Sequence, residues 1–337
     1  MVKDNAAFNK IMNAANVGGG RMVKTTSSPQ CYKWHFVLDN PNNINKVKRC
    51  IPAFTAVNGA PVTVEPSIHG HFAISISREQ ERVFPRTLDC KMVMESGNIL
   101  LGVDEDGESV VRNIKDTRSI LVAGSSGSGK SVAMGTMIMS LAQSSPKTTN
   151  LILIDLKRVE FSLYADLPHL YTPPIYDAHE AVEMLKAALS IIRYRYNLME
   201  QLHARTADFE TLPALVIFID EYAELATSGV VKKSELETII SRIAATGRAC
   251  NVFLVISTQH PISSIISNAI RVNLPTKLGL RTANTAQSIN IIGSRKCCDL
   301  LGKGDAILAV DGELPQRVQM PYLSDDDIDY LLGNVRQ

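Results

Sequence analysis

Residues 120–131 read Ile-Leu-Val-Ala-Gly-Ser-Ser-Gly-Ser-Gly-Lys-Ser, and they constrain the architecture of the chain more than any other segment. Four apolar residues predict a buried strand, the pattern G-x-x-x-x-G-K-S predicts a phosphate-binding loop, and residues 132–142 are compatible with a helix. Glycines let backbone N–H groups converge on a phosphate, and the helix N-terminus adds partial positive charge. We therefore expect a nucleoside triphosphate site formed by Gly124, Ser125, Ser126, Gly127, Ser128, Gly129, Lys130 and Ser131.

Four side chains have predicted roles at this site. Lys130 is expected to bridge the β- and γ-phosphates, and the Ser131 hydroxyl to ligate Mg²⁺. The apolar run 215–219 predicts another buried strand, and it ends in Asp220-Glu221. Asp220 is the predicted second metal ligand, and Glu221 the predicted base that deprotonates the attacking water. The alternative for Glu221 is an acidic residue that stabilises a helix N-terminus.

A third apolar run, 252–256, is followed by Ser257-Thr258-Gln259. Gln259 is the candidate residue that senses the γ-phosphate, and the alternative is that it caps the segment that follows. Asp155 and Lys157 come after the apolar run 151–154. Because active sites of open α/β sheets gather at the carboxyl ends of their strands, we expect all these residues at one edge of the sheet.

Short apolar runs that alternate with helical stretches predict an α/β fold with a mostly parallel central sheet. The clearest helix follows Asp177, which with Glu180 resembles a capping box. We divide the chain into a flexible N-terminal arm at 1–30, a small α/β module at 31–95, and a nucleotide-binding domain at 96–337. The arm is expected because Gly18-Gly19-Gly20 makes a short helix before it marginal.

The composition excludes several classes of protein. The chain has 337 residues, with 35 Lys and Arg against 34 Asp and Glu, so it is neither a uniformly basic chromatin-type protein nor an acidic tail. No apolar run reaches the roughly 18 residues that cross a bilayer, and the N-terminus lacks a secretory signal. Six scattered cysteines are expected to be reduced thiols, so we expect a soluble, cytoplasmic protein.

From about Gly102 to Asp329 the sequence resembles the motor domain of the FtsK/SpoIIIE DNA translocases. Several of the shared motifs have no general meaning in phosphate-loop proteins, which makes the resemblance specific. Besides the phosphate loop, they are Ile154-Asp155-Leu-Lys157, Pro168-His169-Leu170 with Pro173, Arg195-Tyr196-Asn-Leu-Met199, Asp220-Glu221, Thr258-Gln259-x-Pro261, Asn273-Leu-Pro275-Thr276 and Leu300-Leu-Gly302-x-Gly304-Asp305.

The resemblance implies a RecA-like core, a hexameric ring with active sites between neighbouring subunits, ATP as the nucleotide, and double-stranded DNA in the pore. It implies that Arg248 completes the site of the neighbouring subunit; the alternative is a surface arginine at a helix end. Loops that face the pore in the family correspond to Lys232, Lys233, Arg271 and Lys277, for which a solvated basic surface is the alternative.

The sequence also departs from the family. His260 and Ile289 stand where the family has arginines, which puts the usual contacts between subunits in doubt. The family's membrane anchor and C-terminal winged-helix module have no counterpart here. We therefore expect an anchor-free version from a phage, plasmid or conjugative element, without direct membrane insertion and with a channel or recruiting protein as a further partner.

Three functions remain open at this point. The first is an ATP-driven double-stranded DNA translocase. The second is a coupling ATPase in conjugation or secretion that engages a channel or a protein substrate. The third is a non-hydrolysing ATP-binding assembly module, against which the Asp220-Glu221 pair argues.

Overall fold

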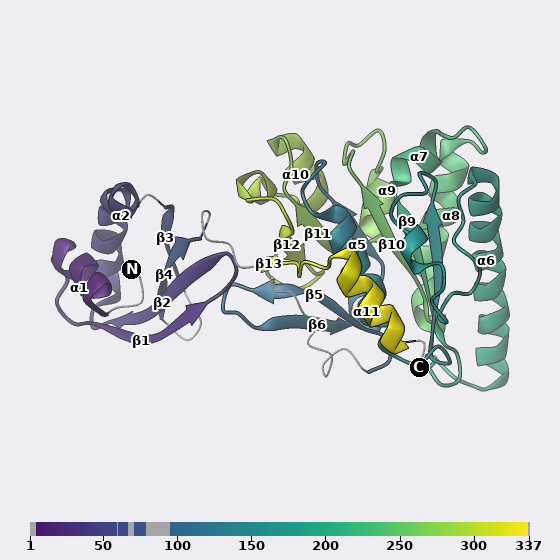
Figure 1. Cartoon of the computed structure of the whole chain (residues 1–337), viewed down its shortest axis with the longest axis horizontal. Helices are drawn as coiled ribbons and strands as arrows, with labels where there is room; N and C mark the ends of the chain where they lie inside the picture. Colours follow the sequence, from purple (N-terminus) through teal and green to yellow (C-terminus); the bar gives the residue numbers. More distant parts are fainter. Residues whose placement is uncertain (1–4, 59, 67–70, 79–94, 336–337) are drawn as a thin grey trace. The chain divides into compact units, whose positions relative to one another are not determined.

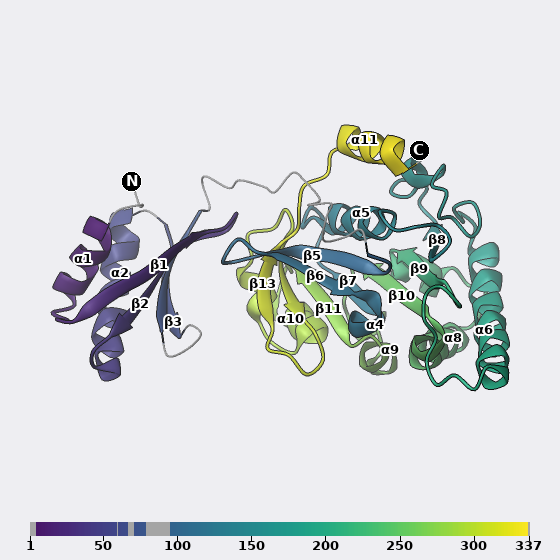
Figure 2. The same cartoon turned by 90° about the horizontal axis from the view of Figure 1, so that it is seen from below.

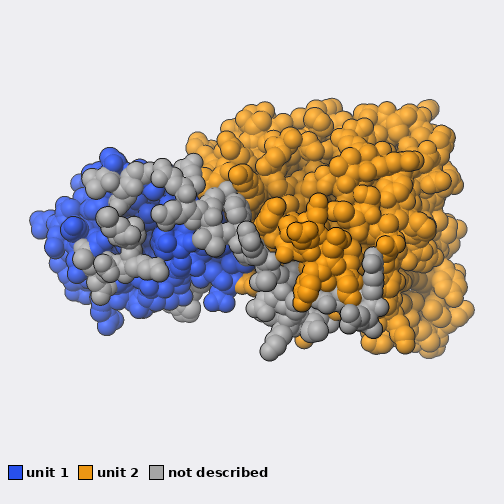
Figure 3. Space-filling model, in the orientation of Figure 1, with its two compact units in different colours: residues 1–85, 103–108 blue, residues 86–102, 109–337 orange. Residues whose placement is uncertain are grey.

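The computed structural model describes residues 5–58, 60–66, 71–78 and 95–335. The chain forms two compact units, which Figure 3 distinguishes by colour. Unit 1 comprises Met1–Pro85 and Val103–Glu108, and unit 2 comprises Arg86–Gly102 and Ser109–Gln337. Cys90 and much of the expected junction near residue 95 lie outside the described residues.

Unit 1 is a four-stranded antiparallel sheet with two helices (Figure 1). Its strand order is β1-β2-β4-β3. Side chains that alternate along the central strands, such as Trp34, Phe36 and Ile74, form its core. The elements are α1 (Asn5–Ala14), β1 (Gly20–Ser27), β2 (Cys31–Leu38), the 3₁₀ turn η1 (Pro41–Asn43), α2 (Ile44–Asn58), β3 (Val62–Pro66) and β4 (Phe72–Ser77).

The expectation of a flexible arm at 1–30 is wrong for the described part of that segment. Helix α1 buries Phe8 against the sheet, with ring centroids 6.3 Å from Trp34 and 5.4 Å from Phe36. The glycine run that predicted an arm is the turn between α1 and β1, where Gly19 has φ +79°. Packing of an apolar helix face onto the sheet outweighs the weak propensity of a short helix.

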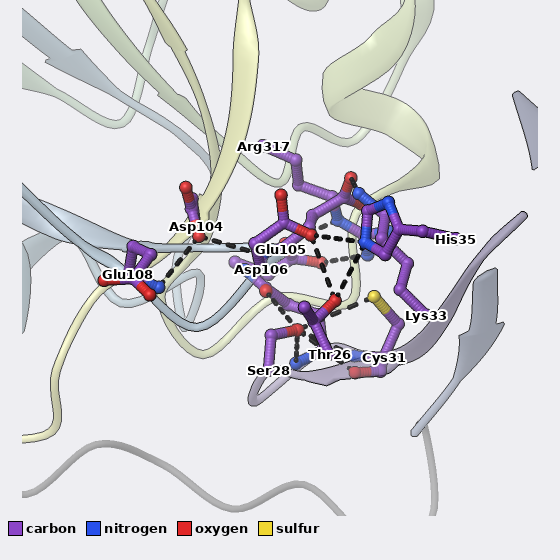
Figure 4. A network of polar contacts seen from close by, with 12 residues as sticks. Thr26, Ser28, Cys31, Lys33, His35, Asp104, Glu105, Asp106, Glu108 and Arg317 are labelled. Atoms are coloured by element: carbon purple, nitrogen blue, oxygen red, sulfur yellow. Dashed lines mark hydrogen bonds and ion pairs between the residues drawn. The ribbon is translucent and has the colours of Figure 1, made fainter. Parts of the chain in front are cut away.

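A second segment returns to unit 1 from further along the chain. Strands β5 (Asn98–Asp104) and β6 (Ser109–Asn113) form a hairpin whose tip, Val103–Glu108, belongs to unit 1. Figure 4 shows the polar contacts that hold this tip. Lys33 Nζ lies 2.7 Å from Glu105 Oε2, and Asp106 Oδ1 lies 3.0 Å from both His35 Nε2 and Thr26 Oγ1. The first unit is therefore completed by residues beyond position 95.

Unit 2 contains a nine-stranded sheet with the order β6-β5-β13-β12-β11-β7-β10-β9-β8. Strands β11, β7, β10, β9 and β8 pair in parallel, whereas β12 is antiparallel to its two neighbours. This mostly parallel sheet confirms the predicted α/β class. The strands are β7 (Ile120–Ala123), β8 (Thr149–Asp155), β9 (Ala214–Asp220), β10 (Val252–Thr258), β11 (Thr276–Leu280), β12 (Asp305–Ala309) and β13 (Gln316–Gln319).

Both faces of this sheet are covered. Successive residues of β7 alternate between two apolar clusters, because Ile120 and Val122 belong to one and Leu121 and Ala123 to the other. Figure 2 shows α5 (Lys130–Leu141) and α11 (Asp325–Val335) on one side, and α8 (Lys233–Thr246) and α9 (Asn268–Asn273) on the other. The remaining helices and 3₁₀ turns are α4 (Ile114–Thr117), η3 (Ser162–Tyr164), α6 (Ala178–Gln201), α7 (Tyr222–Thr227), η4 (Gly247–Cys250), α10 (Thr285–Ile292) and η5 (Lys296–Asp299).

Helix α6 begins where the sequence predicts it. The Asp177 carboxylate accepts hydrogen bonds from the backbone N–H groups of His179 and Glu180, at 2.8 and 3.1 Å.

Among the described residues, no helix has the length and apolar character needed to cross a membrane.

Candidate active site

The parallel strands bring the predicted site residues to one edge of the sheet. Asp155 and Asp220 are register partners at the ends of β8 and β9. Thr258, at the end of β10, is paired with Ala123, which directly precedes the phosphate loop. The expected convergence at the carboxyl ends of the strands is therefore what the topology produces.

The phosphate loop is held from both sides by backbone contacts. The Ser125 N–H and hydroxyl both donate to the Arg281 carbonyl, at 2.9 and 2.8 Å, and the Gly304 N–H donates to the Ser128 carbonyl at 2.7 Å. Gly129 has φ +102°, and a Cβ there would lie 2.3 Å from the Gly304 nitrogen. Only glycine fits at this position.

The loop has room and donors for an anionic ligand. Within the part of the chain that the structure describes, the Ser128 hydroxyl is buried and has no hydrogen-bond partner. A cavity of about 570 Å³ opens beside the loop. Its walls are Ser125, Ser126, Gly127, Ser128, Arg281, Thr282, Ala283, Asn284, Thr285, Cys298, Leu301, Gly302 and Lys303. An unpartnered donor group and a glycine cradle at a helix N-terminus fit a phosphate.

Lys130 and Asp220 form a buried ion pair, each only 5% exposed. Lys130 Nζ donates to Asp220 Oδ1 and, at 3.0 Å, to Ser257 Oγ. Ser257 Oγ in turn donates to Asp220 Oδ1 at 2.8 Å. The sequence predicted the lysine and the aspartate, but it gave no reason to single out Ser257.

Glu221 is held by the strand beside it. One carboxylate oxygen accepts a 2.8 Å hydrogen bond from Thr258 Oγ1, and the other accepts a 2.9 Å bond from the Gln259 N–H. Its backbone has φ +47°, which is uncommon for a residue other than glycine and turns the chain out of β9. The structure thus places Gln259 beside Glu221 through its backbone, and the sensor role of its side chain stays a prediction.

Ser131 has a partner that the sequence analysis missed. Its hydroxyl donates to Glu160 Oε1 at 2.6 Å. Glu160 lies in the loop after β8, and only its position after the Asp155-x-Lys157 motif could have drawn attention to it. Together with Asp220, Ser131 offers oxygen ligands of the kind that Mg²⁺ prefers, so the donor set fits the ion.

Lys157 adds positive charge to the same edge. Burial works against its charged form, but the contact with Glu224 at 3.2 Å and the charge of Glu221 outweigh this effect and raise the pKa of Lys157. Its ammonium group is therefore positive throughout the physiological pH range.

Arg248 is not brought to this site within the chain. It lies exposed in η4, just before the amino end of β10, whereas the active-site residues follow the carboxyl end of that strand. Seven residues of extended chain span about 20 Å. Arg248 therefore lies toward the opposite edge of the sheet from its own phosphate loop.

The four residues predicted to bind DNA have different environments. Lys232 is exposed, while Lys233 Nζ donates to the Ser264 carbonyl and lies 3.3 Å from Glu237 Oε1. Arg271 joins α9 to α10 by donating to Asn290 at 3.1 and 3.2 Å. Lys277 lies within β11, where burial lowers its pKa. Their role in DNA binding stays a prediction, and three of the four have structural partners or are half-buried.

Comparison with known sequences gives a consistent family assignment. A sequence model of the FtsK/SpoIIIE family matches residues 90–211 and 201–263, just over half of the chain. DNA translocase FtsK of Borreliella burgdorferi is 36% identical over 251 residues, which cover 70% of this chain and 32% of that protein. DNA translocase SftA of Bacillus subtilis is 36% identical over 338 residues, which cover 94% of this chain and 35% of that protein. The chain thus spans about a third of the length of these relatives.

Solved structures share the fold. The monomer form of the pCW3 conjugation coupling protein TcpA with ATPγS is 21% identical, with a TM-score of 0.70, and the match covers 99% of both chains. The cytoplasmic domain of the type VII secretion ATPase EccC of Thermomonospora curvata is also 21% identical, with a TM-score of 0.62. That match covers 74% of this chain and 33% of EccC. These likenesses confirm the phosphate-loop ATPase fold.

Proposed function

Since the chain belongs to the FtsK/SpoIIIE family, we propose that it is a Mg²⁺-dependent ATPase that moves double-stranded DNA. The observation that carries the proposal is the convergence of Lys130, Ser131, Asp220 and Glu221 at one edge of the parallel sheet. The DNA translocases FtsK and SftA among its relatives support the choice of DNA as the substrate.

Nucleotide binding begins at the phosphate loop. Its backbone N–H groups and the N-terminus of α5 bind the β-phosphate, and Lys130 exchanges its contact with Asp220 for the β- and γ-phosphates. This exchange frees the Asp220 carboxylate to hold Mg²⁺ together with Ser131. The ion, when bound, neutralises charge that develops on the phosphates.

Glu221 acts as the general base. Thr258 and Gln259 fix its two carboxylate oxygens, so its orientation is set before a substrate arrives. Each carboxylate oxygen has a second lone pair, and one of these can accept a hydrogen bond from the attacking water. Removal of the proton in the transition state is the step that this carboxylate performs.

The cavity beside the phosphate loop is the proposed place of the nucleoside. Its volume of about 570 Å³ lies within the usual range of ligand pockets. Thr282, Asn284 and Thr285 provide hydroxyl and amide groups for a base and a ribose. Because Arg281 is part of this wall, it belongs to the site of its own subunit.

The position of Arg248 supports a ring. A residue far from its own phosphate loop but exposed can reach the site of a neighbour across a heterologous interface. We propose a homohexamer in which Arg248 stabilises charge on the γ-phosphate held by the next subunit. Lys232, Lys233, Arg271 and Lys277 are the proposed contacts to DNA phosphates, and Lys232 is the most accessible of them.

The test is displacement of a third strand from a DNA triplex by the purified chain. We expect ATP-dependent displacement by the wild type and none by Lys130→Ala. DNA-stimulated hydrolysis without displacement would favour the alternative of a coupling ATPase. Absence of nucleotide binding by the wild-type chain would contradict both functions.

A further inference from the structure

The carboxylate of Glu160 lies against the phosphate loop, although it belongs to none of the motifs that define the site. Its Oε1 accepts a 2.6 Å hydrogen bond from the hydroxyl of Ser131. A serine hydroxyl has one hydrogen to donate and two lone pairs to offer. When the hydrogen points to Glu160, both lone pairs of Ser131 remain available to a metal ion.

The backbone that carries Glu160 is rigidly held. Asp155 is fully buried and accepts hydrogen bonds from four backbone N–H groups of the loop, those of Lys157, Arg158, Glu160 and Phe161, at 2.9–3.1 Å. The residue after Glu160 is anchored as well, since the Phe161 ring is buried with its centroid 6.4 Å from that of Tyr164. Burial, together with the charge of Glu160, raises the pKa of Tyr164.

The charge of Glu160 has opposite consequences for free and metal-bound nucleotide. A carboxylate next to Ser131 repels the phosphates that the N-terminus of α5 attracts. A divalent cation between them reverses the sign of the interaction, because the ion is attracted by both. Groups that orient a metal ligand from outside the coordination shell change metal affinity by about 10- to 100-fold when they are removed.

We propose that Glu160 is a positioning residue for nucleotide-bound Mg²⁺, which orients the Ser131 hydroxyl and disfavours binding of metal-free nucleotide. The inference rests on the proposed ATPase function and adds a selectivity to it: the site takes the Mg²⁺ complex of the nucleotide in preference to the free anion. The competing explanation is that Glu160 only stabilises the N-terminus of α5.

The experiment measures the affinity of a fluorescent ADP analogue for the full chain, first in EDTA and then over a Mg²⁺ titration. In Glu160→Gln, we expect tighter binding in EDTA and a rise of about tenfold in the Mg²⁺ concentration at half-maximal enhancement. Glu224→Gln is the matched control, because Glu224 is an exposed carboxylate at the same edge and contacts Lys157 instead. This control should behave like the wild type.

A double-mutant cycle separates positioning from simple stabilisation. Ser131→Ala should weaken the Mg²⁺ dependence by itself, and adding Glu160→Gln to it should change the dependence little further. If Glu160 only stabilised the fold, its replacement by Gln would lower the melting temperature without altering the ratio of the two affinities.

The outcomes are distinct. An unchanged ratio of affinities in Glu160→Gln, with normal nucleotide binding, would overturn the inference and leave the ATPase proposal standing. If the wild type binds no nucleotide in either condition, the proposed function itself fails. Should Glu160→Gln not fold, Glu160→Asp keeps the charge but withdraws it from Ser131, and unchanged Mg²⁺ affinity in this variant would overturn the inference.

Discussion

The ammonium group of Lys130 and the carboxylate of Asp220 neutralise each other in the buried centre of the site, although 90 positions separate them. The pair joins the first residue of α5, which follows β7 and the phosphate loop, to the last residue of β9, and β10 lies between these two strands. In the proposed binding mode nucleotide breaks this ion pair, and until then each charge is compensated by the other inside the protein.

We predict that loss of either partner destabilises the fold as well as abolishing ATP hydrolysis. Removing one member of a buried pair leaves an uncompensated charge, which costs about 3 kcal/mol. Lys130→Met and Asp220→Asn should each lower the free energy of unfolding in urea by about this amount. The double variant should recover most of the stability and none of the activity. Additive losses in the double variant would show that the two charges are not coupled.

Glu221→Gln should bind ATP normally but hydrolyse it at least 100-fold more slowly, because the shape of the side chain is kept and the base is lost. Single-turnover hydrolysis by the DNA-bound chain measures this step. Glu224→Gln, on the neighbouring helix, serves as the control and should keep the wild-type rate. Turnover by Glu221→Gln within about tenfold of the wild type would remove Glu221 from the chemical step.

Arg248→Ala should bind ATP but hydrolyse it poorly, with a loss on the order of 10³ in rate. Mixing it with Lys130→Ala protein should restore part of the activity, since an intact phosphate loop can then meet an intact arginine from its neighbour. Arg242→Ala, which replaces an exposed arginine six positions earlier, on α8, is the control. If mixing gives no rescue, Arg248 does not act between subunits.

Nucleotide should protect Cys298 from alkylation. Cys298 is partly exposed and lines the cavity beside the phosphate loop, so a bound nucleoside would cover its thiol. Labelling by a maleimide, followed by mass spectrometry of the peptides, should slow at least tenfold with saturating ATP in a hydrolysis-deficient variant. Cys50, partly exposed in unit 1, should react at the same rate with and without nucleotide. Equal labelling of Cys298 in both conditions would place the nucleoside elsewhere.

Acidification should loosen the polar contacts of unit 1. Burial lowers the pKa of His35 below its ordinary value, and the charge of Lys24 adds to this against the opposing carboxylate of Asp106. The folded state therefore prefers the neutral imidazole, so this contribution is fully present above about pH 6.5 and decreases as the pH falls further. Hydrogen exchange of β2 amides, corrected for intrinsic rates, should show less protection at pH 5.5 than at pH 7.5. In His35→Gln, which cannot titrate, the difference should shrink.

The site residues that could be predicted from the sequence are those that belong to a short, contiguous motif. The phosphate loop and the Asp220-Glu221 pair each follow an apolar run. The run predicts a buried strand, and the residues directly after it predict the functional site at the end of that strand. Glu160 and Ser257 were not identified because their contacts are with residues distant in the sequence: Glu160 binds Ser131, and Ser257 binds Lys130 and Asp220. The sequence on either side of Glu160 or Ser257 contains no pattern that predicts its hydrogen-bond partner.

The N-terminal segment shows that a local sequence pattern can also lead to a wrong prediction. A run of three glycines signals a break in secondary structure, and it does mark one between α1 and β1. It carries no information about whether Phe8 finds Trp34 and Phe36, which lie more than 25 positions away. Helix α1 is stabilised by packing against residues distant in the sequence, although its intrinsic helix propensity is low.

The hairpin of β5 and β6 makes unit 1 discontinuous along the gene. A chain trimmed to begin at residue 96 would still carry Glu105 and Asp106 but would lack Lys33 and His35, to which they bind. Conversely, a fragment that ends before residue 96 would leave those two basic side chains facing solvent. Exchange of this unit between related proteins by recombination therefore has to transfer two separate segments of the gene, and transfer of one segment alone would break the contacts between them.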